Sequence, residues 1–126
     1  GGAPLEALRI QDQLDANNKL IQQLALGQKL DPFVSAPLFL ALGMERAINI
    51  IQKWIFDLVS VKLVQNSHYH SQQVNALQAL CKSVNLGVLL RFQRDLNEAK
   101  KAANHPLSNE MQLENILLQY TRVFNG

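Results

Sequence analysis

The 126-residue sequence contains one cysteine, Cys81, and only 17% charged residues, whereas 48% of its residues are apolar. A single cysteine cannot form an internal disulfide, so the expected compartment is the reducing cytoplasm. The charge content lies below the roughly 25% of an average globular domain. A chain of this length forms one domain and needs no metal to fold. Its apolar surplus therefore fills the core or faces a partner.

The sequence also lacks a strong basic bias and an uncharged run long enough to cross a membrane. Its net charge is +2, and the basic residues are spread along the chain, which does not predict nucleic-acid binding. The longest apolar segment, residues 47–64, contains Lys53, Asp57 and Lys62. These charges argue against a bilayer span. No N-terminal pattern resembles a signal peptide, and no membrane partner is expected.

Glycine and proline are few, with six and four residues, and they stand where helices would begin or end. Apolar spacing favours helices almost throughout, and runs of alternating β-branched residues are absent. We expect an all-α fold, a compact bundle of about five or six helices. The predicted helical segments are residues 4–14, 15–26, 32–43, 44–64, 71–84, 85–103 and 109–124. Asp15, Asp31 and Asn85 are their predicted N-caps, and Pro37 is expected to kink or split its helix.

The segment Met44–Val64 is the most informative. Its polar positions are separated by three or four residues: Arg46, Asn49, Lys53, Asp57 and Ser60. They form one narrow stripe on a helix, and nearly every other position is apolar. A helix of this kind has to be surrounded by others, because it is apolar over most of its circumference. We predict that it forms the centre of the bundle, with Trp54, Ile51 and Leu58 in the core.

The last two predicted helices each divide into a buried and an exposed side. For residues 85–103 the predicted buried face is Leu86, Leu89, Leu90, Gln93 and Leu96. Its exposed side carries Arg91, Arg94, Asp95, Glu98, Lys100 and Lys101, with ion pairs expected for Arg91–Asp95 and Arg94–Glu98. For residues 109–124 the predicted buried face is Leu113, Ile116, Leu117, Tyr120 and Phe124. Off that face lie the candidate partner contacts Leu118, Thr121, Arg122 and Val123.

No catalytic constellation is present in the sequence. The carboxylates are scattered or stand near basic residues, and neither GxxxxGK[ST] nor GxGxxG occurs. Cys81 lies between Leu77 and Val84 on an apolar helix face, which predicts a buried structural thiol, not a nucleophile. We expect no enzyme activity and no cofactor.

Two alternatives remain open at this stage. A metal or redox protein would use His68, His70 and Cys81, although a metal site needs three or four ligands, and residues 65–71 are typical of a polar surface loop. Metal analysis would decide this case. A small helical nucleic-acid-binding module would use Arg91, Arg94, Lys100 and Lys101, and a steep salt dependence of DNA affinity would support it.

Several short motifs, in order along the chain, resemble one family. They are Gly1-Gly2-Ala3-Pro4-Leu5 followed by Ala7-Leu8, Gln52-Lys53-Trp54-Ile55-Phe56-Asp57-Leu58, His105-Pro106-Leu107, and Leu113-Glu114-Asn115-Ile116-Leu117-Leu118-Gln119-Tyr120. Together they are similar to the C-terminal part of the delta-prime subunits of bacterial DNA polymerase III, which belong to the clamp loader. The turn at residues 105–109 is one residue longer than the family pattern.

The resemblance implies a division of the chain and a role in assembly. Residues 1–14 would be the last helix of an AAA+ lid, and residues 15–126 a helical collar domain that holds the clamp-loader subunits in a ring. The expected partners are the delta and gamma/tau subunits, bound by collar-to-collar packing. DNA and the sliding clamp would be contacted only through the whole complex.

Overall fold

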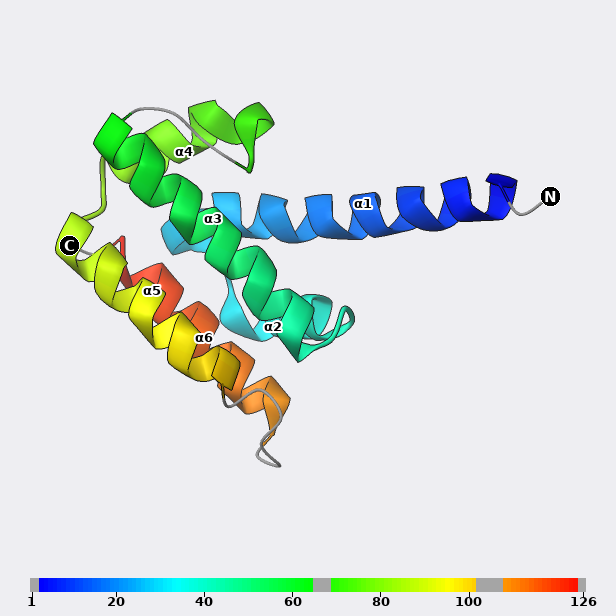
Figure 1. Ribbon diagram of the computed structural model, residues 1–126. Coiled ribbons are helices and arrows are strands. Elements are labelled where there is room, and N and C mark those ends of the chain that lie inside the picture. Colours follow the sequence, from blue (N-terminus) through cyan, green and yellow to red (C-terminus); the bar gives the residue numbers. More distant parts are fainter. Residues whose placement is uncertain (1–2, 65–68, 102–107, 125–126) are drawn as a thin grey trace.

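The computed structural model describes residues 3–64, 69–101 and 108–124, and the side chains of residues 3–13 and 71 lie outside that description. The described residues form six α-helices, two short 3₁₀ helices and no strand (Figure 1). The elements are α1 (Ala3–Ala25), η1 (Gly27–Lys29), α2 (Pro32–Leu40), α3 (Met44–Val64), η2 (Ser71–Gln73), α4 (Val74–Cys81), α5 (Leu86–Lys101) and α6 (Asn109–Arg122). The predicted all-α class is confirmed.

Helix α3 lies at the centre of the bundle and has the predicted bounds. It contacts α1, α2, α4 and α5, and Ile51, Trp54 and Leu58 are 0% exposed. Its enclosure is incomplete, because Phe56 and Leu63 remain exposed. The prediction that the whole apolar circumference is covered is therefore wrong toward the C-terminal end of the helix.

Helix α1 is one continuous helix, so the predicted break at Asp15 is wrong. Asp15 lies exposed inside the helix. No glycine or proline stands between Pro4 and Gly27, and an aspartate alone does not end a helix whose neighbours are good helix formers. The C-terminal part of α1 buries Leu20 and Leu24 in the core, whereas its N-terminal half extends away from the bundle (Figure 1).

The start of α2 follows the sequence prediction closely. Asp31 is its N-cap, and Oδ1 accepts hydrogen bonds from the backbone N–H of Phe33 at 2.9 Å and of Val34 at 3.4 Å. Pro32 occupies the first helical position, where its missing N–H costs nothing. Pro37 does not split the helix, which continues to Leu40.

Two glycines allow the chain to turn after α1 and α2. Gly27 and Gly43 have φ angles of 59° and 91°, a region that other residues rarely adopt. A Cβ on Gly27 would also lie 2.6 Å from Cδ2 of Leu80. Both positions agree with the helix ends predicted there.

Helix α5 begins as predicted but buries a different stripe. Asn85 Oδ1 accepts from the N–H groups of Gly87 and Val88 at 2.8 and 3.4 Å, which confirms the predicted cap. Phe92 is buried together with Leu89 and Leu96, whereas Leu90, predicted to be buried, is 45% exposed. Because α5 contacts both α3 and α6, its buried stripe is centred between the two neighbours.

The exposed side of α5 carries the basic residues as predicted, but not the predicted ion pairs. Within the described part of the chain, Glu98 pairs with Lys101 at 3.5 Å, not with Arg94. Both side chains of this pair are strongly exposed, where an ion pair stabilises little. The predicted Arg91–Asp95 pair is likewise not formed among these residues.

Helix α6 completes the core. Ser108 Oγ accepts from the N–H of Met111 at 3.3 Å and caps the helix. The five residues predicted to be buried here are buried: Leu113, Ile116, Leu117, Tyr120 and Phe124. The predicted break at residues 104–106 lies outside the described residues.

Candidate partner interface

A buried chain of hydrogen bonds joins α3, α6 and α1. Trp54 Nε1–H donates to the Tyr120 hydroxyl at 2.8 Å, and that hydroxyl donates to the Leu24 carbonyl at 2.6 Å. Burial raises the pKa of Tyr120 far above its ordinary value, so the hydroxyl keeps the proton that it donates. Because each buried polar group has a partner, this network stabilises the core and is not a reactive site.

A second network ties the segment before α4 to α3. The carboxylate of Asp57, 0% exposed, accepts from Tyr69 N at 3.0 Å, from His70 N at 2.6 Å and from His70 Nδ1 at 2.9 Å. Asp57, predicted to lie on the polar stripe of this helix, is therefore buried, and the side chain of His70, predicted to lie in a polar surface loop, is only 12% exposed. Helical periodicity could not predict this contact, because its partners stand 13 positions apart and belong to different segments.

The metal alternative has no support in this geometry. His70 uses Nδ1 for Asp57, and His68 lies outside the described residues. In residues 3–64, 69–101 and 108–124, no group of three His, Cys, Asp or Glu side chains is placed to hold a metal ion.

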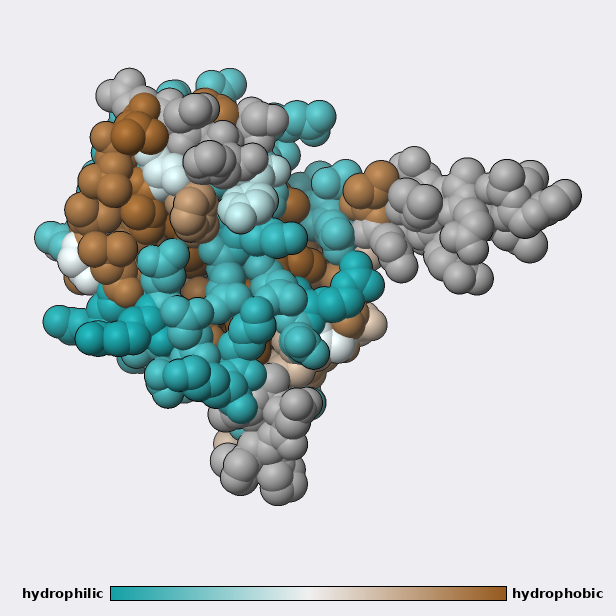
Figure 2. Space-filling view, in the orientation of Figure 1, coloured by the Kyte–Doolittle hydropathy of each residue, from teal (hydrophilic) through white to brown (hydrophobic). Residues whose placement is uncertain are grey.

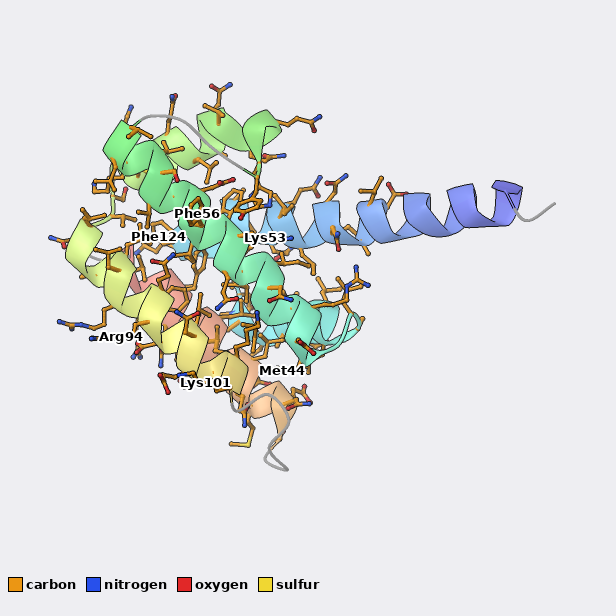
Figure 3. All side chains as sticks on the ribbon, viewed as in Figure 1. Met44, Lys53, Phe56, Arg94, Lys101 and Phe124 are labelled. Carbon is orange, nitrogen blue, oxygen red and sulfur yellow. The ribbon has the colours of Figure 1, made fainter. Side chains whose placement is uncertain are left out.

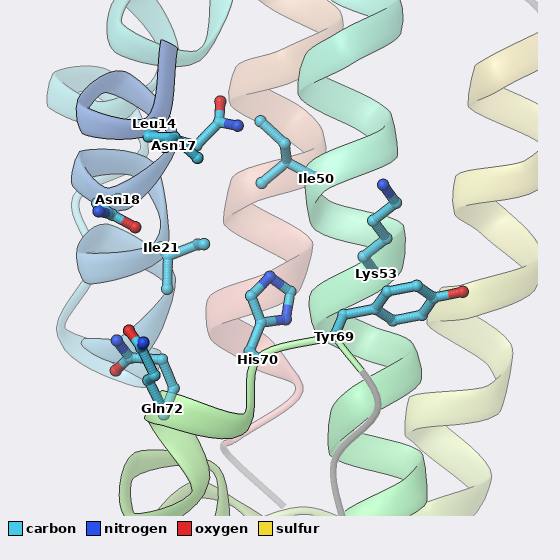
Figure 4. Close-up of a pocket in the computed structure, with 10 residues that line it drawn as sticks. Leu14, Asn17, Asn18, Ile21, Ile50, Lys53, Tyr69, His70 and Gln72 are labelled. Atoms are coloured by element: carbon cyan, nitrogen blue, oxygen red, sulfur yellow. The ribbon is translucent and has the colours of Figure 1, made fainter. Parts of the chain in front are cut away.

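A polar pocket of about 370 Å³ opens beside His70, between α1, α3 and η2 (Figure 4). Its polar lining is mostly amide, from Asn17, Asn18, Gln72 and Gln73, and it includes no carboxylate or thiol. The Oδ1 atom of Asn17 is buried without a hydrogen-bond partner among the described residues. Beside these amides the lining includes Lys53, Tyr69 and His70, and Nδ1 of His70 is bound to the Asp57 carboxylate.

Cys81 is a buried thiol, as predicted. Its Sγ donates to the Leu58 carbonyl at 3.2 Å. Burial raises the pKa of the thiol, and the nearby positive charge of Lys62 offsets this only in part. A thiol held in its protonated form is a poor nucleophile.

The four predicted contact residues on α6 do not share one surface. Leu118 and Arg122 are exposed, but Thr121 and Val123 are buried. The assumption that α6 has one narrow buried stripe is wrong, since α6 packs against α2 as well as α5. Leu118 and Arg122 remain available to a partner.

The outer side of α2 is an exposed apolar surface, here called the α2 face. It consists of Phe33, which is 72% exposed, together with Val34 and Leu38. Helix α2 itself contains no charged residue. Periodicity could not identify it, because nearly every position in the helix is apolar.

A second apolar surface, here called the α3–α5 face, consists of Phe56, Leu63 and Leu90. Figure 2 shows hydrophobic surface gathered over the C-terminal end of α3 and the N-terminal end of α5. Leu90 also lines a shallow notch with Gly87, Arg91 and Arg94. The Arg94 side chain extends from α5 away from the bundle (Figure 3).

No single helix among the described residues is long and apolar enough to cross a membrane. Helices α2 and α3 reach that length and composition only when taken together, and they are bent by 118° at the break between them.

Comparison with known proteins identifies the family. No curated protein and no solved structure matches the chain. A family model matches residues 11–122, which confirms the resemblance to DNA polymerase III clamp-loader subunits without distinguishing delta-prime. The chain belongs to the family described as DNA polymerase III, delta subunit, C terminal.

Proposed function

We propose that this chain is the collar domain of a clamp-loader delta-prime subunit, a non-catalytic domain without a cofactor. It holds the subunits of the DNA polymerase III clamp loader in a ring so that the sliding clamp can be loaded during replication. The family match supports the complex, and the ordered motifs from Gln52–Leu58 and Leu113–Tyr120 support the delta-prime assignment.

The observation that carries the assembly role is the exposed apolar surface of α2 and of the α3–α5 face. Soluble monomers rarely expose large contiguous apolar patches, and such patches mark interaction sites. Interface centres are depleted in charge and enriched in aromatic residues. Phe33 and Phe56 provide exposed aromatic rings on the two faces, and the 17% charge content of the chain agrees with this use.

The proposed division places the last lid helix at residues 1–14 and the collar at residues 15–126. Because α1 continues through residues 14 and 15, the lid and the collar would share one helix. A shared helix would transmit the orientation of the collar to the AAA+ module. The proposed partners are the delta and gamma/tau subunits in the cytoplasm, with DNA and the clamp reached only through the whole complex.

Co-purification with the other clamp-loader subunits tests the proposal. The wild-type subunit should enter the complex. Phe33→Asp on the α2 face and Leu118→Asp on α6 should each weaken its entry, because a charge buried at an apolar interface position weakens binding strongly. Circular dichroism and a cooperative melt must first show that each variant is folded. Unchanged entry of a folded variant would place the interface away from the residue that it replaces. A wild-type subunit that never joins the complex would refute the clamp-loader role.

A nucleic-acid-binding module is the second candidate function. It is favoured by four basic side chains that are all exposed on α5: Arg91, Arg94, Lys100 and Lys101. Asp95 and Glu98 are exposed on the same helix and reduce its positive potential. A DNA affinity that falls steeply with salt would support this candidate, and the absence of binding at low salt would exclude it.

A further inference from the structure

Two polar pockets meet on the surface of α3. The first is the pocket of about 370 Å³ beside His70, and the second, of about 330 Å³, lies between α3 and α5. Lys53 and Tyr69 line both pockets, which therefore form one groove across α3, here called the α3 groove. The described residues that line it include two exposed lysines, Lys53 and Lys100, and no carboxylate. The groove therefore favours an anionic ligand.

Two partly exposed aromatic rings lie where the pockets meet. Tyr69 is 55% exposed and Phe56 is 40% exposed, and they pack edge to face with ring centres 5.6 Å apart. The Lys53 ammonium group lies 5.6 Å from the centre of the Tyr69 ring. Proteins that bind single-stranded nucleic acids combine these two parts, aromatic rings on which bases stack and basic side chains that contact the phosphates. An acidic peptide would use the lysines alone, so the rings favour a nucleic acid.

Amide side chains supply most of the other polar groups, four in each pocket. Amides both donate and accept, and they bind the edges of bases in nucleic-acid complexes. Oδ1 of Asn17 is a buried acceptor without a partner among the described residues, and its side chain points from α1 toward Ile50 of α3 (Figure 4). Every unpaired base presents an N–H group on its Watson–Crick edge. Asn17 can therefore accept a hydrogen bond from any base, and the groove needs no particular sequence.

We propose that the α3 groove binds single-stranded nucleic acid. One base enters the first pocket, packs against Ile50 and donates a hydrogen bond to Asn17 Oδ1, while a neighbouring base stacks on Tyr69. Lys53 and Lys100 contact the phosphates. Because only two lysines take part, the logarithm of the binding constant should fall by about 1.4 for each tenfold rise in salt. Binding this weak becomes significant at physiological salt only where a larger complex already holds the strand nearby.

Fluorescence anisotropy of the chain with three labelled probes tests this proposal. The probes are an oligo-dT strand of about 15 nucleotides, a strand of the same length built from abasic nucleotides, and a polyglutamate peptide of similar length. At low salt we expect oligo-dT to bind at least about fivefold more tightly than the abasic strand, since loss of one stacked base has an effect of this size. The peptide should bind no more tightly than the abasic strand. Equal binding of the two strands, tighter binding of the peptide than of oligo-dT, or no binding of oligo-dT overturns the proposal.

Substitutions then locate the site, once circular dichroism has shown that each variant is folded. Tyr69→Ala should weaken oligo-dT binding at least about fivefold, and Lys53→Gln should reduce the salt slope by about 0.7. Asn17→Leu should weaken binding of oligo-dT but not of the abasic strand. The matched control is Lys82→Gln, because Lys82 is exposed and lines a different pocket.

Two results with these variants would overturn the groove assignment. The first is an equal effect of Lys53→Gln and the control Lys82→Gln. The second is a loss of binding in the double variant Arg91→Gln with Arg94→Gln but not in Lys53→Gln, which would place the nucleic acid on the other end of α5. None of these measurements involves another subunit, so a negative result leaves the proposed assembly role standing.

Discussion

Removing only the hydroxyl of Tyr120 tests how the core is held together. In the folded chain this hydroxyl accepts from Trp54 Nε1–H at 2.8 Å and donates to the Leu24 carbonyl at 2.6 Å. Tyr120→Phe keeps the ring and therefore opens almost no cavity. It leaves one buried donor and one buried acceptor without these partners, and each costs about 1–3 kcal/mol. We expect a total loss of about 2–6 kcal/mol.

The assay is urea denaturation followed by circular dichroism, in a double-mutant cycle with Trp54→Phe. Trp54→Phe removes the indole donor and leaves a cavity, and the cycle cancels the part of its cost that does not depend on Tyr120. The double variant should therefore lose less than the sum of the single losses, by about 0.5–3 kcal/mol. Trp54→Ala, which removes the whole side chain from the centre of α3, should cost about 3–5 kcal/mol.

Two results would refute this reasoning. A loss below about 0.5 kcal/mol for Tyr120→Phe would fall within the range of surface substitutions and would show that the hydroxyl is not a buried bridge. Strict additivity in the cycle would show that Trp54 and Tyr120 are not coupled. A loss below about 1 kcal/mol for Trp54→Ala would also contradict the central position of α3, because it is far below the cost of a core cavity.

Three further predictions concern other parts of the fold. Asp57→Ala leaves the N–H groups of residues 69 and 70 without their acceptor and should cost about 2–4 kcal/mol in urea melts; a loss under about 1 kcal/mol would contradict the buried network. The pKa of Cys81 is raised in the folded state, so stability is fully present below the ordinary thiol value of about 8.5 and falls as pH rises above it. The urea midpoint should therefore decrease less between pH 8 and pH 10 in Cys81→Ala than in wild type. Equal decreases would show that ionisation of this thiol does not lower the stability. Val123→Asp should unfold the chain because Val123 is buried, whereas Leu118→Asp should keep a cooperative melt; similar melts for the two would contradict the packing of α6.

The elements that followed from the sequence are those fixed by local chemistry. Asp31 and Asn85 have the short acceptor side chains that cap helices, and both are caps in the structure. Met44–Val64 is a long helix with one narrow polar stripe, so its central position follows from apolar pattern alone. Local signals of this kind do not depend on which helix packs against which.

The features that sequence alone could not give depend on contacts between helices. Phe92, and not Leu90, lies in the core because α5 packs against both α3 and α6. Periodicity alone does not reveal the contact with the second helix. Val123 was assigned to the surface for the same reason. Asp57 was placed on a polar stripe because its partner at His70 comes from another segment.

The candidate interface was predictable only in part. Leu118 and Arg122 were found as positions off the main stripe of α6, and both are exposed. The α2 face was missed because α2 has apolar residues at nearly every position, so their spacing does not show which side of the helix is buried. The neighbouring helices decide which side is covered.

The proposed assembly role of this chain can be measured directly. Mass photometry would compare complexes reconstituted with the complete subunit that carries this chain and with the same subunit lacking residues 11–122, the range matched by the family model. If this chain holds the subunits together, a full complex forms in the first case, and free subunits or incomplete complexes remain in the second. A full complex that forms equally well without these residues would contradict the claim.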